Sequence, residues 1–147
     1  MKVAVLMGSA SDRPKMAPAL ETLAEFGVEG EEHVLSAHRT PVKVAEFARG
    51  AREAGFGALI CGAGMAAHLA GAVAANTTLP VIGVPLSGSA LNGVDALYAT
   101  VQMPRGIPVA TVAVDNATNA ALLAVEILAV SDPSLAARLA GYRDGWA

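Results

Sequence analysis

Apolar runs and helix-like segments alternate along this chain, and this alternation restricts the fold more than any other feature. Strand-like runs stand at residues 3–7, 28–35, 56–61, 79–85 and 108–114. Helix-like segments stand at residues 14–26, 41–54, 92–103, 119–130 and 133–143, and a further small-residue helix ends near residue 76. Continuous apolar strands that alternate with helices over short connections are typical of a parallel sheet covered on both faces.

We therefore predict an α/β fold of three layers. Its centre is a flavodoxin-like parallel sheet of about five strands in the order 2-1-3-4-5, with helices on both faces, in preference to a half-Rossmann order. Residues 1–147 are expected to form a single domain, because this length suits one hydrophobic core. Trp146 is expected to anchor the tail or a subunit contact.

The composition indicates a homo-oligomer rather than a membrane protein. Hydrophobic residues make up 54% of the chain and charged residues only 16%, whereas about 25% charged is usual for a soluble domain. No stretch reaches the roughly 18 uninterrupted apolar residues of a spanning helix, so the excess apolar surface is expected between subunits. A net charge of -3 gives no electrostatic case for nucleic acid or an anionic membrane. Without a signal-peptide pattern, a cytoplasmic location is expected.

Polar and glycine residues follow each of the first four predicted strands. Parallel strands bring their carboxyl ends to one edge of a sheet, where ligands of open α/β sheets bind. A Ser/Gly loop that opens onto a helix offers free backbone amides to an anion, and Arg39 adds a planar cation. The pattern predicts a phosphorylated small molecule as ligand. The residues at this edge are Gly8, Ser9, Ser11 and Asp12, then Ser36, His38 and Arg39, then Gly62, Gly64 and His68, and finally Pro85, Ser87 and Ser89.

Two residues at this edge also have a simple structural interpretation. Asp12 would repel a phosphate, so it either accepts hydrogen bonds from sugar hydroxyls or only caps the helix that follows. Thr40 is predicted to be the N-cap of the helix that Pro41 opens.

His38 and His68 both belong to the predicted edge. His68 stands among apolar residues and is either a satisfied core residue or a site residue. Two histidines without metal-spaced carboxylates point to proton transfer rather than metal chemistry, so no metal site is expected. His33 is interpreted as a solvated strand residue without a site role, and the single cysteine, Cys61, as a buried structural thiol.

Six blocks of sequence, in the same order across nearly the whole chain, resemble the PurE family of purine biosynthesis, the N5-carboxyaminoimidazole ribonucleotide mutases. The blocks are Met-Gly-Ser-Ala-Ser-Asp at residues 7–12, Ser-Ala-His-Arg-Thr-Pro at 36–41, Ala-Ala-His-Leu at 66–69, Pro-Val-Ile-Gly-Val-Pro at 80–85, Val-Gln-Met-Pro-Arg-Gly-Ile-Pro-Val at 101–109 and Asn-Ala-Ala-Leu-Leu-Ala at 119–124. The resemblance implies a homo-octamer and the conversion of N5-carboxyaminoimidazole ribonucleotide to 4-carboxy-5-aminoimidazole ribonucleotide, without metal, ATP or biotin.

The resemblance also implies roles for individual residues. His38 matches the catalytic histidine, and His68 matches a second active-site histidine. The substrate-binding residues are Ser9, Asp12 and Arg39 on the nucleotide, Ser11 and Ser36 beside the phosphate, and Gly64 and Ala66 in the apolar loop 62–69. We expect that loop to form a dry pocket for a carbon dioxide intermediate, while His38 moves the proton.

The chain departs from the family pattern at Met65, where Gly is usual, at Ala70, where Pro is usual, and in a shortened turn at 114–119. Both residues are assigned to the loop of the carbon dioxide pocket and are expected to bear on its shape. Two alternative interpretations stay open: a carboxylase that joins carbon dioxide directly to aminoimidazole ribonucleotide, and a non-catalytic nucleotide-binding module. His68 and Arg39, each within its matching block, favour the mutase.

Overall fold

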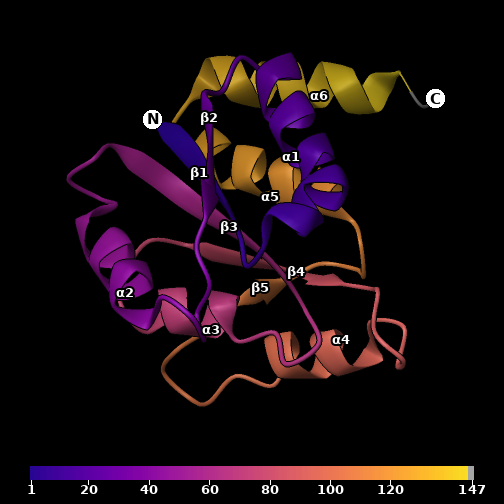
Figure 1. Ribbon diagram of the computed structural model, residues 1–147. Helices are drawn as coiled ribbons and strands as arrows, with labels where there is room; N and C mark the ends of the chain where they lie inside the picture. Colours follow the sequence, from indigo (N-terminus) through magenta and orange to yellow (C-terminus); the bar gives the residue numbers. More distant parts are fainter. Residues whose placement is uncertain (146–147) are drawn as a thin grey trace.

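A computed structural model describes residues 1–145, so Trp146 and its expected anchoring role lie outside the described residues. The chain forms one five-stranded parallel sheet in the order β2-β1-β3-β4-β5, which confirms the predicted topology (Figure 1). The strands are β1 (Lys2–Met7), β2 (Gly30–Val34), β3 (Phe56–Gly64), β4 (Val81–Leu86) and β5 (Ala110–Thr111).

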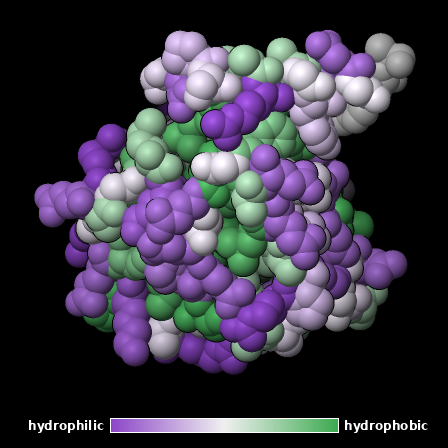
Figure 2. All heavy atoms as spheres, turned by 90° about the horizontal axis from the view of Figure 1, so that it is seen from above, coloured by the Kyte–Doolittle hydropathy of each residue, from purple (hydrophilic) through white to green (hydrophobic). Residues whose placement is uncertain are grey.

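Helices cover both faces of the sheet and make the three predicted layers (Figure 1). One side carries α1 (Arg13–Glu25), α5 (Ala117–Ala129) and α6 (Pro133–Asp144). The other side carries α2 (Pro41–Gly50), α3 (Leu69–Ala74) and α4 (Val94–Val101). A short 3-10 helix, η1 (Ala10–Asp12), precedes α1. Figure 2 shows hydrophilic side chains over much of the face seen from above, with hydrophobic atoms exposed between them.

The strand β1 shows why its sequence is continuously apolar. Val3, Val5 and Met7 belong to the core beneath α1 and α5, whereas Ala4 and Leu6 belong to the core beneath α2 and α3. All five are fully buried. Because successive side chains of a strand point to opposite faces, a strand covered on both faces leaves no position for a polar residue.

Several element ends differ from the sequence-based predictions. β3 continues to Gly64, so residues 62–64, predicted as loop, are part of the sheet. β5 has only two residues, where residues 108–114 were predicted. As an edge strand it pairs with β4 alone, through Ala110 and Thr111, and an edge is restrained on one side only. α2 ends at Gly50 rather than near residue 54.

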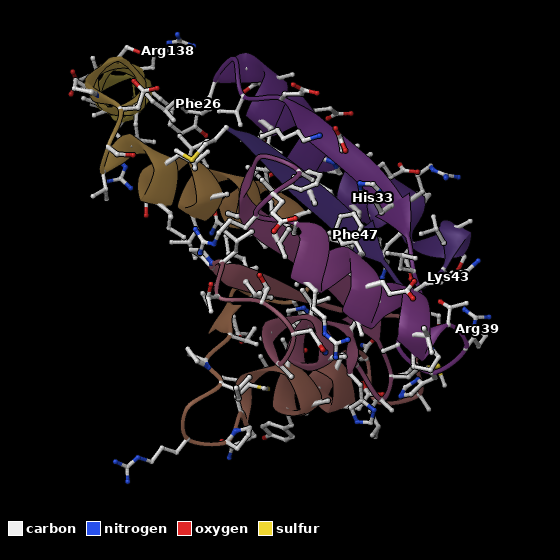
Figure 3. The ribbon with its side chains drawn as sticks, turned by 90° about the vertical axis from the view of Figure 1, so that its left-hand side faces the viewer. Phe26, His33, Arg39, Lys43, Phe47 and Arg138 are labelled. Atoms are coloured by element: carbon white, nitrogen blue, oxygen red, sulfur yellow. The ribbon has the colours of Figure 1, made fainter. Side chains whose placement is uncertain are left out.

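The interpretation of His33 as a solvated residue is wrong. Its ring is half-buried, with its centroid 4.4 Å from that of Phe47 on α2 and 6.2 Å from that of Phe56. Its Nε2 lies 3.4 Å from Glu31 Oε2. Figure 3 shows His33 beside Phe47 and apart from Arg39, which lies toward one end of α2. His33 therefore packs between β2 and α2, because an aromatic ring fills the space that Phe47 and Phe56 leave.

No helix within residues 1–145 combines the length and the apolar character needed to cross a lipid bilayer.

Candidate active site

A cavity of about 660 Å³ lies at the carboxyl ends of the first four strands. It is lined by residues that follow β1, β2, β3 and β4, which confirms that the polar segments meet at one edge of the sheet. Every predicted site residue lies in its wall: Ser9, Ser11, Asp12, Ser36, His38, Arg39, Gly64, Ala66 and His68.

The two predicted histidines meet inside this cavity. His38 Nε2 lies 2.6 Å from His68 Nδ1, and the two rings cross at 78°. Both side chains are exposed to the cavity and to solvent, so the interpretation of His68 as a core residue is wrong. A hydrogen bond between two ring nitrogens holds one proton between them. The pair can therefore accept and return a proton at the cavity wall.

The loop after β2 places Arg39 over the end of β1. Arg39 Nη2 donates to the carbonyl oxygen of Gly8 at 3.0 Å. Ser36 Oγ accepts hydrogen bonds from the backbone N–H of Arg39 at 3.2 Å and from its Nε at 3.3 Å. The guanidinium is thus held in place before any ligand binds, and it keeps further N–H groups for an anion.

Thr40 is the N-cap residue of α2, as predicted, but its side chain makes no capping hydrogen bond to that helix. Its Oγ1 instead accepts from the N–H of Ser36 at 3.1 Å and donates to the carbonyl oxygen of Ser36 at 3.0 Å. The hydroxyl therefore closes the loop that carries His38 and Arg39. Pro41 does open α2, as predicted.

The loop after β1 is organised around Ser9. Ser9 Oγ accepts from Ser11 Oγ at 2.8 Å and from Ser11 N–H at 3.3 Å, and the N–H of Ser9 donates to Asp12 Oδ2 at 3.1 Å. This is a capping box on η1. The Asp12 side chain therefore caps η1 and makes no capping hydrogen bond to α1, the helix that follows it. Its Oδ1 accepts no hydrogen bond from the described residues, so the interpretation as an acceptor for a sugar hydroxyl stays compatible with the geometry. Burial raises the pKa of Asp12 more than Ser9, Lys15 and Arg39 lower it.

The cavity also contains Lys15, which the sequence did not single out, and Ser87 and Ser89, which were placed at this edge without a role. Lys15 lies in the first turn of α1. Helical side chains lean toward the helix N-terminus, so a cation just after a Ser/Gly loop was a usable signal. Asp115 stands next to them, 3.2 Å from Lys15 Nζ.

The two departures from the family pattern have different environments. Met65 lines the cavity with 65% of its surface exposed, and its φ of 55° lies in the left-handed region that favours glycine. Ala70 does not line the cavity. It is buried in α3, where a Cβ built on Gly83 would lie 3.4 Å from its own Cβ. Only Met65 therefore bears on the shape of the site, and the expectation for Ala70 is wrong.

A larger hollow, of about 990 Å³, lies near the opposite edge of the sheet, by the start of β4 and β5. Its wall contains Arg49, Arg52 and Glu53 but no histidine. We assign the chemistry to the smaller cavity, because that one gathers the groups that exchange protons and bind anions.

Within residues 1–145, no three His, Cys, Asp or Glu side chains are grouped so that they could hold a metal ion. Cys61 is buried, as predicted, and desolvation raises the pKa of its thiol well above the ordinary value.

Fold and site together define a flavodoxin-like α/β protein with a histidine-containing site at the carboxyl edge of its sheet. The model of the family described as "AIR carboxylase" matches residues 2–146, and this chain belongs to that family.

Named relatives support this membership. The chain is 54% identical over 143 residues to an "N5-carboxyaminoimidazole ribonucleotide mutase" of Pyrococcus abyssi, and the alignment covers 97% of this chain and 82% of the relative. It is also 58% identical over 132 residues to a "Phosphoribosylaminoimidazole carboxylase" of Ogataea methanolica, and this alignment covers 90% of this chain and 24% of the relative. The crystal structure of Treponema denticola PurE superposes with a TM-score of 0.86 at 29% identity, covering 97% of this chain and 89% of that one.

Proposed function

We propose that this protein is an N5-carboxyaminoimidazole ribonucleotide mutase of de novo purine biosynthesis. The observation that carries the proposal is the hydrogen-bonded pair His38–His68, 2.6 Å apart, in a serine- and arginine-lined cavity of an AIR carboxylase family member. Several relatives over nearly the whole chain bear the mutase name.

The proposed reaction needs a group that first gives and later takes a proton. Protonation of the exocyclic nitrogen of the substrate breaks its bond to the carboxyl carbon and releases carbon dioxide. The ring carbon C4 then attacks the carbon dioxide and forms the new carbon–carbon bond, and C4 finally loses its proton. Protons balance over the cycle, so one histidine suffices. We assign this proton to His38, with His68 as its hydrogen-bond partner.

The remaining residues bind and orient the nucleotide in this proposal. Arg39, Ser36 and Ser11 bind the phosphate, because the guanidinium and the two hydroxyls can donate to anionic oxygens. The hydroxyl of Ser11 exchanges Ser9 Oγ for the phosphate when the nucleotide binds. Ser9 and Asp12 serve the ribonucleotide, with the free Oδ1 of Asp12 as an acceptor for a sugar hydroxyl. The part of the cavity wall that comes from the end of β3 and the following loop consists of Ala63, Gly64, Met65, Ala66, His68 and Leu69. This lining is mostly apolar, which suits the retention of carbon dioxide, with His68 placing the carboxylate.

The assembly is proposed to be a cytoplasmic homo-octamer of single-domain subunits that use no metal, ATP or biotin. An apolar stripe along α4 supports subunit contacts. It consists of Val94, Tyr98 and Val101, which are 48%, 63% and 47% exposed, and Leu91 in the turn before the helix is 62% exposed. The spacing of four and three residues puts Val94, Tyr98 and Val101 on one face of α4, and such a face is normally covered by a partner. We assign it to a second copy of this chain.

Two assays in parallel test the function. Product is measured from N5-carboxyaminoimidazole ribonucleotide at low carbon dioxide, and separately from aminoimidazole ribonucleotide with bicarbonate. We expect efficient turnover of the first, with the second requiring high bicarbonate. Efficient use of the second route alone would make the protein a direct carboxylase, the activity that the Ogataea methanolica relative's name states. Nucleotide binding without product from either would indicate a binding module.

A further inference from the structure

Lys15, Ser87 and Asp115 come from three separate segments and meet at one side of the cavity. Lys15 Nζ donates to the carbonyl oxygen of Ser87 at 2.9 Å and also to Ser87 Oγ, and it lies 3.2 Å from both carboxylate oxygens of Asp115. Ser87 N–H donates to Asp115 Oδ1 at 2.9 Å, and Ser87 Oγ donates to Oδ2. The network holds the ammonium group at the end of β4.

The pairing leaves Lys15 free to exchange its partner. Burial alone would raise the pKa of Asp115, but hydrogen bonds from Ser87 and Lys15 outweigh it and hold the pKa below its ordinary value. The side chains of Lys15 and Asp115 are 36% and 35% exposed. Ion pairs this open to water contribute little net stability. An incoming anion can therefore compete with Asp115 for the ammonium group.

Lys15 and Arg39 stand on opposite sides of the cavity. The guanidinium of Arg39 rests on Gly8 at the end of β1, whereas Lys15 rests on Ser87 at the end of β4. β3 separates these two strands, so the strand ends that anchor the two cations are two strand spacings apart, about 10 Å. Lys15 and Ser87 line the cavity, and Asp115 does not. The cavity is thus arranged for a ligand with an anionic group at each end.

We propose that Lys15 contacts the carboxylate on the base of the nucleotide, while Arg39 takes the phosphate. This assignment rests on the proposed function, in which substrate and product both carry that carboxylate. During the reaction the carboxylate moves from the exocyclic nitrogen to ring carbon C4. A lysine ammonium is a compact charge on a flexible stem, so it can follow the carboxylate between the two positions, as a planar guanidinium cannot.

The test compares two nucleotides that carry the same phosphate. Binding of 4-carboxy-5-aminoimidazole ribonucleotide and of aminoimidazole ribonucleotide is measured by calorimetry on the full chain and on Lys15→Met and Lys15→Arg. Lys15→Met should weaken the carboxylated nucleotide about 10-fold or more, as expected for a lost charge-assisted hydrogen bond. It should change the decarboxylated nucleotide less than about 2-fold, which also shows that the variant is folded. Lys15→Arg should restore most of the loss, because it keeps the charge.

Two further variants separate substrate contact from a purely structural clasp. Asp115→Asn breaks the same ion pair but leaves the ammonium free, so it should bind the carboxylated nucleotide at least as tightly as the full chain. Arg143→Met is a control, because it removes one cation from an ion pair with Glu126 elsewhere, and it should have no effect on either nucleotide.

Some outcomes would overturn the assignment. An equal loss for both nucleotides in Lys15→Met would show that Lys15 serves the phosphate or the general field of the cavity. If Asp115→Asn loses as much affinity for the carboxylated nucleotide as Lys15→Met does, the network of Lys15, Ser87 and Asp115 has only a structural role. Failure of the unaltered chain to bind either nucleotide would overturn the proposed function, and this assignment with it.

Discussion

At the scale of single residues, the hydrogen-bonded pair His38–His68 gives the most direct test of the proposed proton transfer. His38→Asn keeps a polar side chain that can hydrogen-bond to His68 but cannot exchange a proton near neutral pH. We expect turnover of N5-carboxyaminoimidazole ribonucleotide to fall about 10²–10⁴-fold, as for loss of a general acid–base group, with nucleotide binding kept.

His33→Asn is the matched control for this prediction. His33 packs against Phe47 outside the cavity, so its loss should lower the melting temperature with little change in turnover. Full activity of His38→Asn in a steady-state assay would remove His38 from the mechanism.

Asp12 leads to a residue-scale prediction about pH. Its pKa is raised in the folded chain, so folding disfavours the ionised carboxylate. The resulting loss of stability is present above the folded pKa and disappears as the pH falls below the unfolded value. Asp12→Asn, whose amide oxygen can still accept from Ser9 N–H, should therefore be as stable as the full chain or more so at pH 7, with no gain in acid. Urea unfolding at both pH values measures this, and a destabilised variant at pH 7 would contradict it.

At the scale of elements, the turn between β3 and α3 carries backbone strain at Met65. A non-glycine residue in the left-handed region costs about 1 kcal/mol or more. Met65→Gly should relieve the strain, and because 65% of the side chain is exposed it should lose little packing. We expect a net gain of up to about 1 kcal/mol, roughly 3 °C in melting temperature at this chain length.

Met65→Ala is the control for the strained turn, because alanine keeps the strain and removes only the thioether side chain. If Met65→Gly melts below Met65→Ala, the expected relief of strain does not control the stability of this turn.

At the scale of the whole molecule, the apolar stripe on α4 predicts which substitution disrupts the contacts between subunits. Tyr98→Glu places a charge in the middle of the stripe, where burial between copies would require its desolvation. Sedimentation should then show smaller species than the octamer expected for the full chain, whereas Tyr98→Phe should leave the assembly unchanged. An unaltered octamer in Tyr98→Glu would place the subunit contacts elsewhere.

The strand order, the two-faced core and the gathering of the predicted site residues in one cavity were all predictable from the sequence. Each depends on a local rule: continuous apolar strands need cover on both faces, and parallel strands end at one edge. Position along the chain therefore placed Ser9, Ser36 and His68 on the same edge of the sheet.

Contacts between distant segments were decided only by the tertiary structure. The 2.6 Å contact of His38 with His68, the packing of His33 on Phe47 and the meeting of Lys15 with Asp115 join residues from different elements. The lengths of β3 and β5 likewise depend on whether a neighbouring strand is present to pair with. Periodicity and turn chemistry report which face or edge a residue occupies, but the partner it finds there depends on how the helices pack across the sheet.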